Sequence, residues 1–139
     1  MAYFLKEKIN LEDLAAVENF RKAIVIVEPE EYLLDLYCEY FNRHNFHVRG
    51  CGSIDLLEKL LEQHRPHLLI INVGFLLKAG SSFLAKNSQD IGFKILSIGY
   101  NTDLEAVKKI MPLGVAAHID RRTTKPQDVV DIALAMLNE

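Results

Sequence analysis

The feature of this sequence that most limits its fold is a regular alternation between short β-rich runs and longer stretches of helical periodicity. Three of the five β-rich runs are apolar or nearly so along their whole length. Such runs are typical of parallel strands in a sheet that is covered on both faces. The five runs occupy residues 23–27, 46–50, 68–72, 94–98 and 115–119.

Helical patterns fill the intervals between these runs. Ser53 precedes one amphipathic stretch as a good N-cap, Thr102 and Glu105 form a capping box, and Pro126 stands where a first helical turn tolerates proline. The predicted helices cover residues 30–44, 53–64, 81–86, 102–111 and 125–139. Five strand–helix units in this order, joined by right-handed crossovers, predict an α/β doubly wound parallel sheet.

A further segment precedes the first strand. Asn10 is a plausible cap there, and Leu11, Leu14 and Phe20 follow at helical spacing. We therefore expect an appended helix in residues 1–21 and one domain over residues 22–139.

Composition limits the class of protein. A chain of 139 residues, of which 50% are hydrophobic, can bury one sizeable core. The formal charge of -3 offers no electrostatic footprint for nucleic acid or an anionic membrane. No apolar run reaches the roughly 20 residues of a spanning helix, and the first residues do not resemble a signal peptide. We expect a cytoplasmic protein in which Cys38 and Cys51 are reduced thiols.

The residues at the carboxyl ends of the predicted strands are the candidates for a site, because ligands of open parallel sheets bind in the crevice at that edge. Neither of the two strongest nucleotide-phosphate motifs, G-x-G-x-x-G and G-x-x-x-x-G-K-[ST], follows the first strand. The candidate positions are Glu28, Pro29 and Glu30 after the first strand, Asn72 at the end of the third, Gly99 after the fourth, and His118 and Arg121 around the end of the fifth.

These positions resemble those of a known family, the receiver domains of two-component response regulators, over Lys22 to Leu137. The most specific stretch is "NVGFLLKAGSSFL" (72–84), which is similar to the family pattern D-V-x-x-P-x-x-x-G-x-x-x-L. Twenty-two positions separate Gly99 from Arg121, as they separate the switch hydroxyl of the family from its lysine. The resemblance implies a flavodoxin-like sheet with strand order 2-1-3-4-5.

The resemblance also implies that the phosphorylation chemistry of the family is lost. Asn72 stands where the family has the aspartate that accepts a phosphoryl group, and an amide has no anionic oxygen for that attack. The acid pair that holds magnesium is replaced by Glu28 and Pro29. Gly99 replaces the switch hydroxyl and Arg121 the lysine. We therefore expect no catalytic residue, no metal and no cofactor.

An ion pair is a candidate substitute for the metal. Glu28 faces Arg121 across the predicted crevice, so a salt bridge between them would hold the site in one state. Lys125 could reach the same crevice if the register slipped. His118 matches the switch aromatic of the family, and it is either a plain strand residue or a rotating interface side chain.

Two H-x-x-H pairs are predicted at the opposite, amino edge of the sheet. They are His44 with His47 and His64 with His67. Zinc ligation is conceivable, but the simpler interpretation is that His44 and His64 cap helix carboxyl ends.

Excess apolar surface suggests association. The last predicted helix has almost no polar face, and Phe75, Leu76 and Leu77, in a predicted loop after the third strand, form a second apolar group. A homodimer through the fourth helix, fifth strand and fifth helix is one explanation, and cover by the N-terminal helix is the other. The interface candidates are Leu104, Val107, Met111, Val129, Ile132 and Met136.

The sequence thus predicts a degenerate receiver domain, a pseudo-receiver that acts in signal transduction through protein partners without phosphorylation. The alternative is a phosphate- or nucleotide-binding module of flavodoxin-like type. An enzyme is disfavoured because no nucleophile has a base partner in reach.

Overall fold

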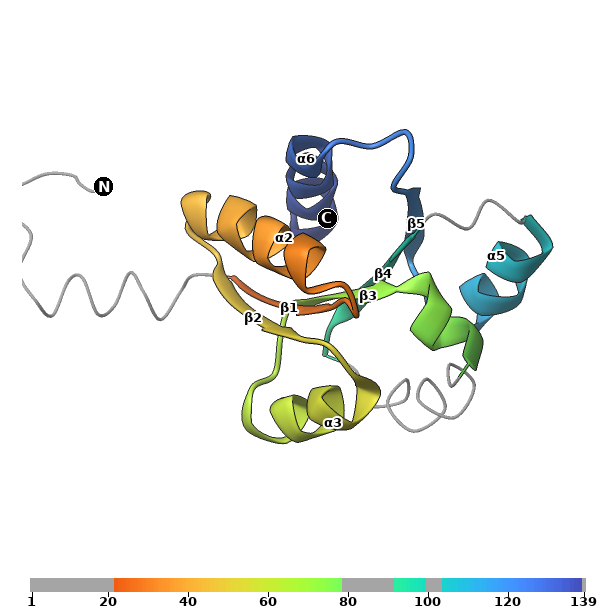
Figure 1. The fold of residues 1–139 in the computed structure, drawn as a ribbon, viewed down its shortest axis with the longest axis horizontal. Coiled ribbons are helices and arrows are strands. Elements are labelled where there is room, and N and C mark those ends of the chain that lie inside the picture. Colours follow the sequence, from red (N-terminus) through yellow and green to blue (C-terminus); the bar gives the residue numbers. More distant parts are fainter. Residues whose placement is uncertain (1–21, 79–91, 100–103, 139) are drawn as a thin grey trace, which may run out of the picture.

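The computed structural model of the chain describes residues 22–78, 92–99 and 104–138. Their strands form one parallel sheet of five strands in the order β2-β1-β3-β4-β5, which confirms the predicted doubly wound topology (Figure 1). The strands are β1 (Ala23–Val27), β2 (His47–Cys51), β3 (Leu68–Asn72), β4 (Lys94–Gly99) and β5 (Ala117–Asp120).

Helices lie on both faces of the sheet. In Figure 1, α2 and α6 lie together above the sheet and α3 lies below it. The helices are α2 (Glu31–Arg43), α3 (Ile54–Gln63), α5 (Leu104–Ile110) and α6 (Pro126–Leu137), with a 3₁₀ turn η1 (Met111–Leu113) after α5. Among the described residues, no helix is long and apolar enough to cross a membrane.

The core has two halves because successive side chains of a strand point to opposite faces. Ile24 and Ile26 of β1 pack against Phe41 of α2 and Val129 of α6. Val25 and Val27 contribute to the other half, with Leu57 of α3. The strand β1 is therefore buried on both faces, which explains its uninterrupted apolar sequence.

Two of the predicted helix starts are confirmed. The Ser53 side chain accepts a hydrogen bond from the backbone N–H of Leu56 at 3.2 Å, as an N-cap does. Pro126 is the first residue of α6, where its missing N–H has no helical partner to lose. The capping residue Thr102 lies outside the described residues, as do the predicted helices in residues 1–21 and 81–86.

The segment after β3 differs from the prediction. Residues 73–78 are helical and follow the strand without a loop, although the sequence pattern indicated a loop at Phe75, Leu76 and Leu77. The physical reason is Asn72, whose side-chain oxygen Oδ1 accepts the backbone N–H of Gly74 at 2.8 Å. Asn72 is therefore both the last residue of β3 and the N-cap of the helical segment 73–78.

Candidate functional site

The sheet brings four of the predicted site residues to one edge. Asn72 and Gly99 are the last residues of β3 and β4, and Glu28 and Arg121 directly follow β1 and β5. Backbone hydrogen bonds extend the sheet into this region. The Glu28 N–H donates to the carbonyl of Cys51 at 3.0 Å, and the Arg121 N–H donates to the carbonyl of Gly99 at 2.9 Å. The flanking backbone of both charged residues is therefore fixed by the sheet.

The centre of the site is an ion pair between Glu28 and Arg121. The Nη2 atom of Arg121 donates to Oε1 of Glu28, and their side chains are only 6% and 2% exposed. The salt bridge expected from the sequence is confirmed. Because both charges are withdrawn from water, each depends on the other for compensation.

Neutral hydrogen bonds complete the environment of the carboxylate. Asn72 donates from Nδ2 to Glu28 Oε1 at 3.3 Å, and the backbone N–H of Glu30 donates to Glu28 Oε2 at 3.0 Å. Both carboxylate oxygens therefore already have protein donors. A buried carboxylate needs such donors, since unmet acceptors in the interior are costly.

Tyr37 of α2 supports the guanidinium from the other side. Arg121 donates from Nε to the Tyr37 hydroxyl at 3.2 Å, and its Cζ lies 5.6 Å from the centroid of the Tyr37 ring. In the sequence, Tyr37 fits an apolar position of the predicted helix in residues 30–44, and that pattern does not predict this role. The available signal was that a buried tyrosine hydroxyl usually finds a hydrogen-bonding partner.

The protonation of Arg121 is secure. Burial alone would lower its pKa, but the hydrogen bond to Glu28 and the interactions with Tyr37 and Glu28 raise the pKa above its ordinary value. Arginine is already protonated throughout the physiological range. The ion pair is therefore not a switch that deprotonation of Arg121 could operate.

Asn72 has a fixed orientation because both ends of its amide are engaged. Oδ1 accepts from Gly74 and Nδ2 donates to Glu28. An aspartate side chain in the same place would keep the first bond but would present an anionic oxygen to the Glu28 carboxylate. The neutral Nδ2–H group of Asn72 is therefore a suitable partner for the Glu28 carboxylate.

The other two residues of the predicted acidic pocket are not buried beside Glu28. Pro29 and Glu30 are exposed, and Glu30 occupies the N-cap position of α2 without a side-chain capping bond. Within residues 22–78, 92–99 and 104–138, no group of three or more His, Cys, Asp or Glu side chains could hold a metal ion.

The other two predicted switch positions, Gly99 and His118, lie on β4 and β5. A Cβ atom on Gly99 would lie 2.5 Å from Val73 Cγ1, so a hydroxyl-bearing side chain does not fit unless Val73 moves. His118 is half-buried in β5, with its Nδ1 atom 2.7 Å from Ser97 Oγ on the neighbouring strand. Lys125, the alternative partner for the crevice, is instead the N-cap residue of α6.

The interface candidates differ in their accessibility. Val129 and Met136 are buried in the core between α6, α2 and the sheet, so they are not available to a partner. Val107, Met111 and Ile132 are partly exposed, and the side chain of Leu104 lies outside the described part. Much of the apolar surface expected on the last helix is therefore covered within the domain.

The histidines of the H-x-x-H pairs lie near the amino edge, as predicted. His44 and His64 are the C-cap residues of α2 and α3. His67 Nδ1 accepts the backbone N–H of Ala23 at 2.9 Å, which requires a neutral ring at that nitrogen. Burial, and then the positive charge of Lys22, lower the pKa of His67 below its ordinary value.

Comparisons with known proteins place the fold. No protein-family model and no curated protein matches the sequence. A response regulator from Thermotoga maritima matches with a TM-score of 0.77 at 9% identity, over 86% of this chain and 100% of that one. A CheY-like receiver domain protein from Methanospirillum hungatei JF-1 matches with a TM-score of 0.75 at 18% identity, over 85% and 94%.

A third match is a larger protein. NtrX from Brucella abortus, whose structure is a complex with ATP, aligns with a TM-score of 0.74 at 15% identity over 86% of this chain and 27% of its own length. The matched structures share few residues with this chain, but they share its strand order and helix arrangement. The chain has the flavodoxin-like fold of response regulator receiver domains.

Proposed function

We propose that this protein is a pseudo-receiver, which acts in signal transduction through contacts with protein partners and does not accept a phosphoryl group. The observation that carries the proposal is the buried Glu28–Arg121 ion pair with Asn72 beside it. In a working receiver the resemblance implies an aspartate and a magnesium ion at these positions. Here the neutral amide of Asn72 stands at the aspartate position, and Glu28, the carboxylate that remains of the acid pair, is paired with the Arg121 guanidinium.

The ion pair leaves no ligand set for magnesium. Magnesium prefers near-octahedral oxygen coordination with one or two carboxylates, and the single buried carboxylate already accepts three hydrogen bonds. The positive guanidinium would also repel a divalent cation. Arg121 therefore supplies the counter-charge that a metal would otherwise supply.

The same pair favours a single conformational state. Separating two buried charges costs about 3–5 kcal/mol, which is comparable to a large part of the stability of a small domain. At that cost, a second state with the two charges apart would be populated at roughly 1% or less. We infer that the carboxyl edge presents one constant surface to its partners.

The rival function, a phosphate- or nucleotide-binding module, has less support at this edge. Its natural cation, Arg121, is engaged by Glu28 and Tyr37, and Glu30 and Glu31 lie exposed at the start of α2. An incoming phosphate would meet carboxylates before it met a free donor.

Incubation with acetyl phosphate and magnesium, followed by intact-mass measurement, tests the proposal. We expect no adduct and no thermal stabilisation by beryllofluoride. The Asn72→Asp variant is the matched control, and it too should remain unmodified because Arg121 still fills the site. That variant should also lose about 2–4 kcal/mol of stability, since it loses a donor and gains a carboxylate beside Glu28. A phosphoryl adduct mapped to this crevice in the unaltered protein would refute the pseudo-receiver.

Association is the second part of the proposal. We expect a homodimer through the surface of α5, β5 and α6, in the cytoplasm, with the N-terminal segment 1–21 as an appendage to the domain. Among the described side chains, those that offer apolar area on this surface include Val107, Ile132 and Leu134, the last of them 37% exposed. Light scattering on the full chain and on Leu134→Glu tests this. A monomeric full chain, or a dimer unaffected by the substitution, would contradict the interface.

A further inference from the structure

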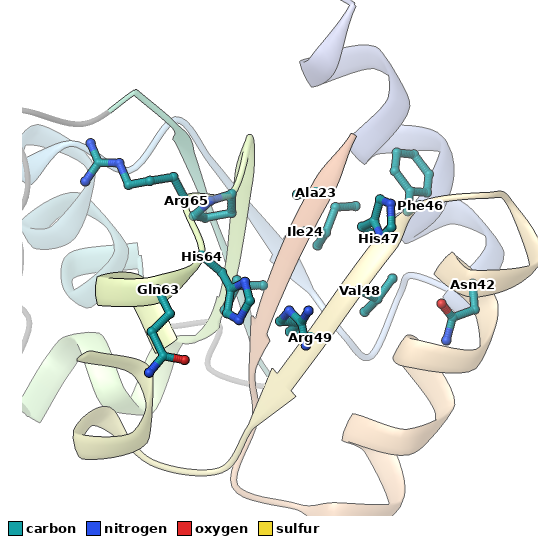
Figure 2. A pocket seen from close by; sticks show the side chains of 12 residues that line it. Ala23, Ile24, Asn42, Phe46, His47, Val48, Arg49, Gln63, His64 and Arg65 are labelled. Carbon is teal, nitrogen blue, oxygen red and sulfur yellow. The ribbon is translucent and has the colours of Figure 1, made fainter. Parts of the chain in front are cut away.

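The amino edge of the sheet, opposite the ion pair, contains a cavity of about 470 Å³. Its walls come from the beginnings of β1 and β2 and from the carboxyl ends of α2 and α3 (Figure 2). The volume lies in the range of about 300–1,000 Å³ that is typical of small-molecule sites. Nothing in the proposed signalling function uses this cavity.

The polar lining of the cavity has one sign of charge. Arg49, Arg65, His47 and His64 line it, and none of its twelve lining residues is an aspartate or a glutamate. This is notable in a chain with 19 acidic and 16 basic residues, where acidic side chains are the more numerous. The polar lining is therefore arranged for an anion.

Arg49 has the side chain best suited to bind a ligand. In the described part of the chain, Arg43, Arg121 and Arg122 form ion pairs with carboxylates, and Arg65 lies 6.0 Å from the ring centroid of Phe93. The guanidinium of Arg49 makes no ion pair or hydrogen bond with any described residue. Its donors remain open to the cavity.

Arg49, on β2, and His64, at the end of α3, both line the same space at the amino edge of the sheet (Figure 2). Arg65 projects away from this space, in keeping with its contact with Phe93. A guanidinium offers a planar pair of donors that matches a carboxylate or phosphate, and an imidazole N–H lining the same cavity offers a further donor. The two residues thus form a binding point for an oxyanion.

Apart from the amides of Asn42 and Gln63, the remaining lining residues are apolar. Ala23 and Val48 are partly exposed there, whereas Ile24, Val25 and Phe46 are at most 5% exposed, so the cavity offers a small apolar surface beside the cationic groups. An inorganic phosphate would fill only part of it. We propose that this cavity binds a small organic anion, with a phosphate or carboxylate group held by Arg49 and His64 and an apolar body against β1 and β2.

The structure also offers a competing explanation for the cations. Both α2 and α3 end beside the cavity, and cations near helix carboxyl ends contribute about 0.3–1 kcal/mol to stability. In that case Arg49 would stabilise the folded chain and would bind nothing. The two explanations differ in ligand binding, which can be measured directly.

The experiment is a titration of the full chain with phenyl phosphate, monitored through the backbone amide resonances. We expect saturable shifts confined to the segments that line the cavity, residues 23–25, 46–49 and 63–66, with a dissociation constant on the order of 1 mM. Inorganic phosphate should bind more weakly at the same place, because it lacks the apolar body. Phenol, which has the body and no anion, should cause no comparable shift, and benzoate tests whether a carboxylate replaces the phosphate.

Matched variants locate the anion. Arg49→Gln should weaken phenyl phosphate binding about tenfold, which corresponds to one charge-assisted hydrogen bond. Arg43→Gln removes an equal charge nearby from a residue that does not line the cavity, so it should leave binding unchanged. Both side chains are exposed, and circular dichroism verifies that each variant is folded.

Four results would overturn the proposal. These are the absence of shifts at 20-fold the expected constant (about 20 mM), an equal loss in both variants, shifts confined to the carboxyl edge, and equal binding of phenol. In a fifth result, Arg49→Gln would alter the resonances of residues 1–21, and the occupant would then be the N-terminal segment of the chain itself. The small-anion site would then be rejected.

Discussion

Replacing Arg121 by methionine should destabilise the protein far more than replacing its neighbour Arg122. The Arg121→Met change removes the cation from the ion pair and leaves the Glu28 carboxylate at 2% exposure without its counter-charge. Methionine has similar length and no charge, so the change tests charge compensation more than packing. Arg122 is the matched control, because its side chain is 57% exposed and its ion pair with Asp120 is open to solvent.

The expected magnitude follows from the contacts. Breaking a buried ion pair by removal of one partner costs about 3–5 kcal/mol. We expect the lower end, about 3 kcal/mol, because Glu28 keeps two hydrogen bonds, from Asn72 and from the backbone of Glu30. Arg122→Met should cost less than about 1 kcal/mol, as exposed pairs do.

Urea unfolding followed by circular dichroism measures both changes. With a slope of about 2 kcal/mol per molar urea, a loss of 3 kcal/mol lowers the midpoint by about 1.5 M. The double variant Glu28→Gln with Arg121→Met closes a mutant cycle. It should recover to within about 1 kcal/mol of the parent, because a buried pair replaced on both sides is often nearly neutral.

Two results would refute this reasoning. If Arg121→Met lost less than about 1 kcal/mol, Glu28 would be compensated by some other group and the pair would not organise the site. If the double variant lost the sum of the two single changes, the residues would act independently, and the short contact between them would carry no coupling energy.

Three further changes test other parts of the structure. Gly99→Ser should lose about 1–3 kcal/mol of stability in urea unfolding, because its Cβ would meet Val73 Cγ1 at 2.5 Å, and Val73→Ala in the same chain should recover part of the loss. Stability should fall as the pH is lowered from 7.5 through 6.5 towards 5, because the lowered pKa of His67 means that the folded state resists protonation more than the unfolded state does. His67→Gln should flatten this dependence in paired unfolding curves, and an unchanged slope would exclude His67 as its source. Burial raises the pKa of Cys38 to about 11, so about one molecule in a thousand is thiolate at pH 8. Its reaction with Ellman's reagent should be slow in buffer and fast in urea, and fast reaction of the folded chain would contradict the burial.

Much of the fold was predictable because its signals are local. The apolar runs of β1 and β3 predict buried parallel strands, and β1 has the bounds expected from the sequence. Ser53 and Pro126 mark helix starts through their own chemistry, so they could be recognised without tertiary information. The later start of β5, at Ala117, shows the usual uncertainty of strand boundaries.

Contacts within the site could be predicted from the sequence only between residues that directly follow the ends of the strands. Parallel topology places Glu28 and Arg121 at one edge, and opposite charge then favours the pair. Tyr37 could not be assigned to the site in the same way, because its contribution depends on how α2 packs over the sheet. The close approach of Val73 to Gly99 was also hidden, since it arises from the helical turn that begins at Asn72.

Three of the residues at this site, Glu28, Asn72 and Arg121, depend on one another. Glu28 and Arg121 balance to zero net charge, so the third residue at their side must be neutral, and it must donate to Glu28 and accept from Gly74. An asparagine meets all of these conditions, whereas an aspartate would leave the buried cluster with an extra negative charge. The helical turn that Asn72 caps brings Val73 against Gly99, which removes the room for a switch hydroxyl. Under the proposed function, we therefore expect that a single reversion does not produce a phosphate acceptor and that several positions would have to change together.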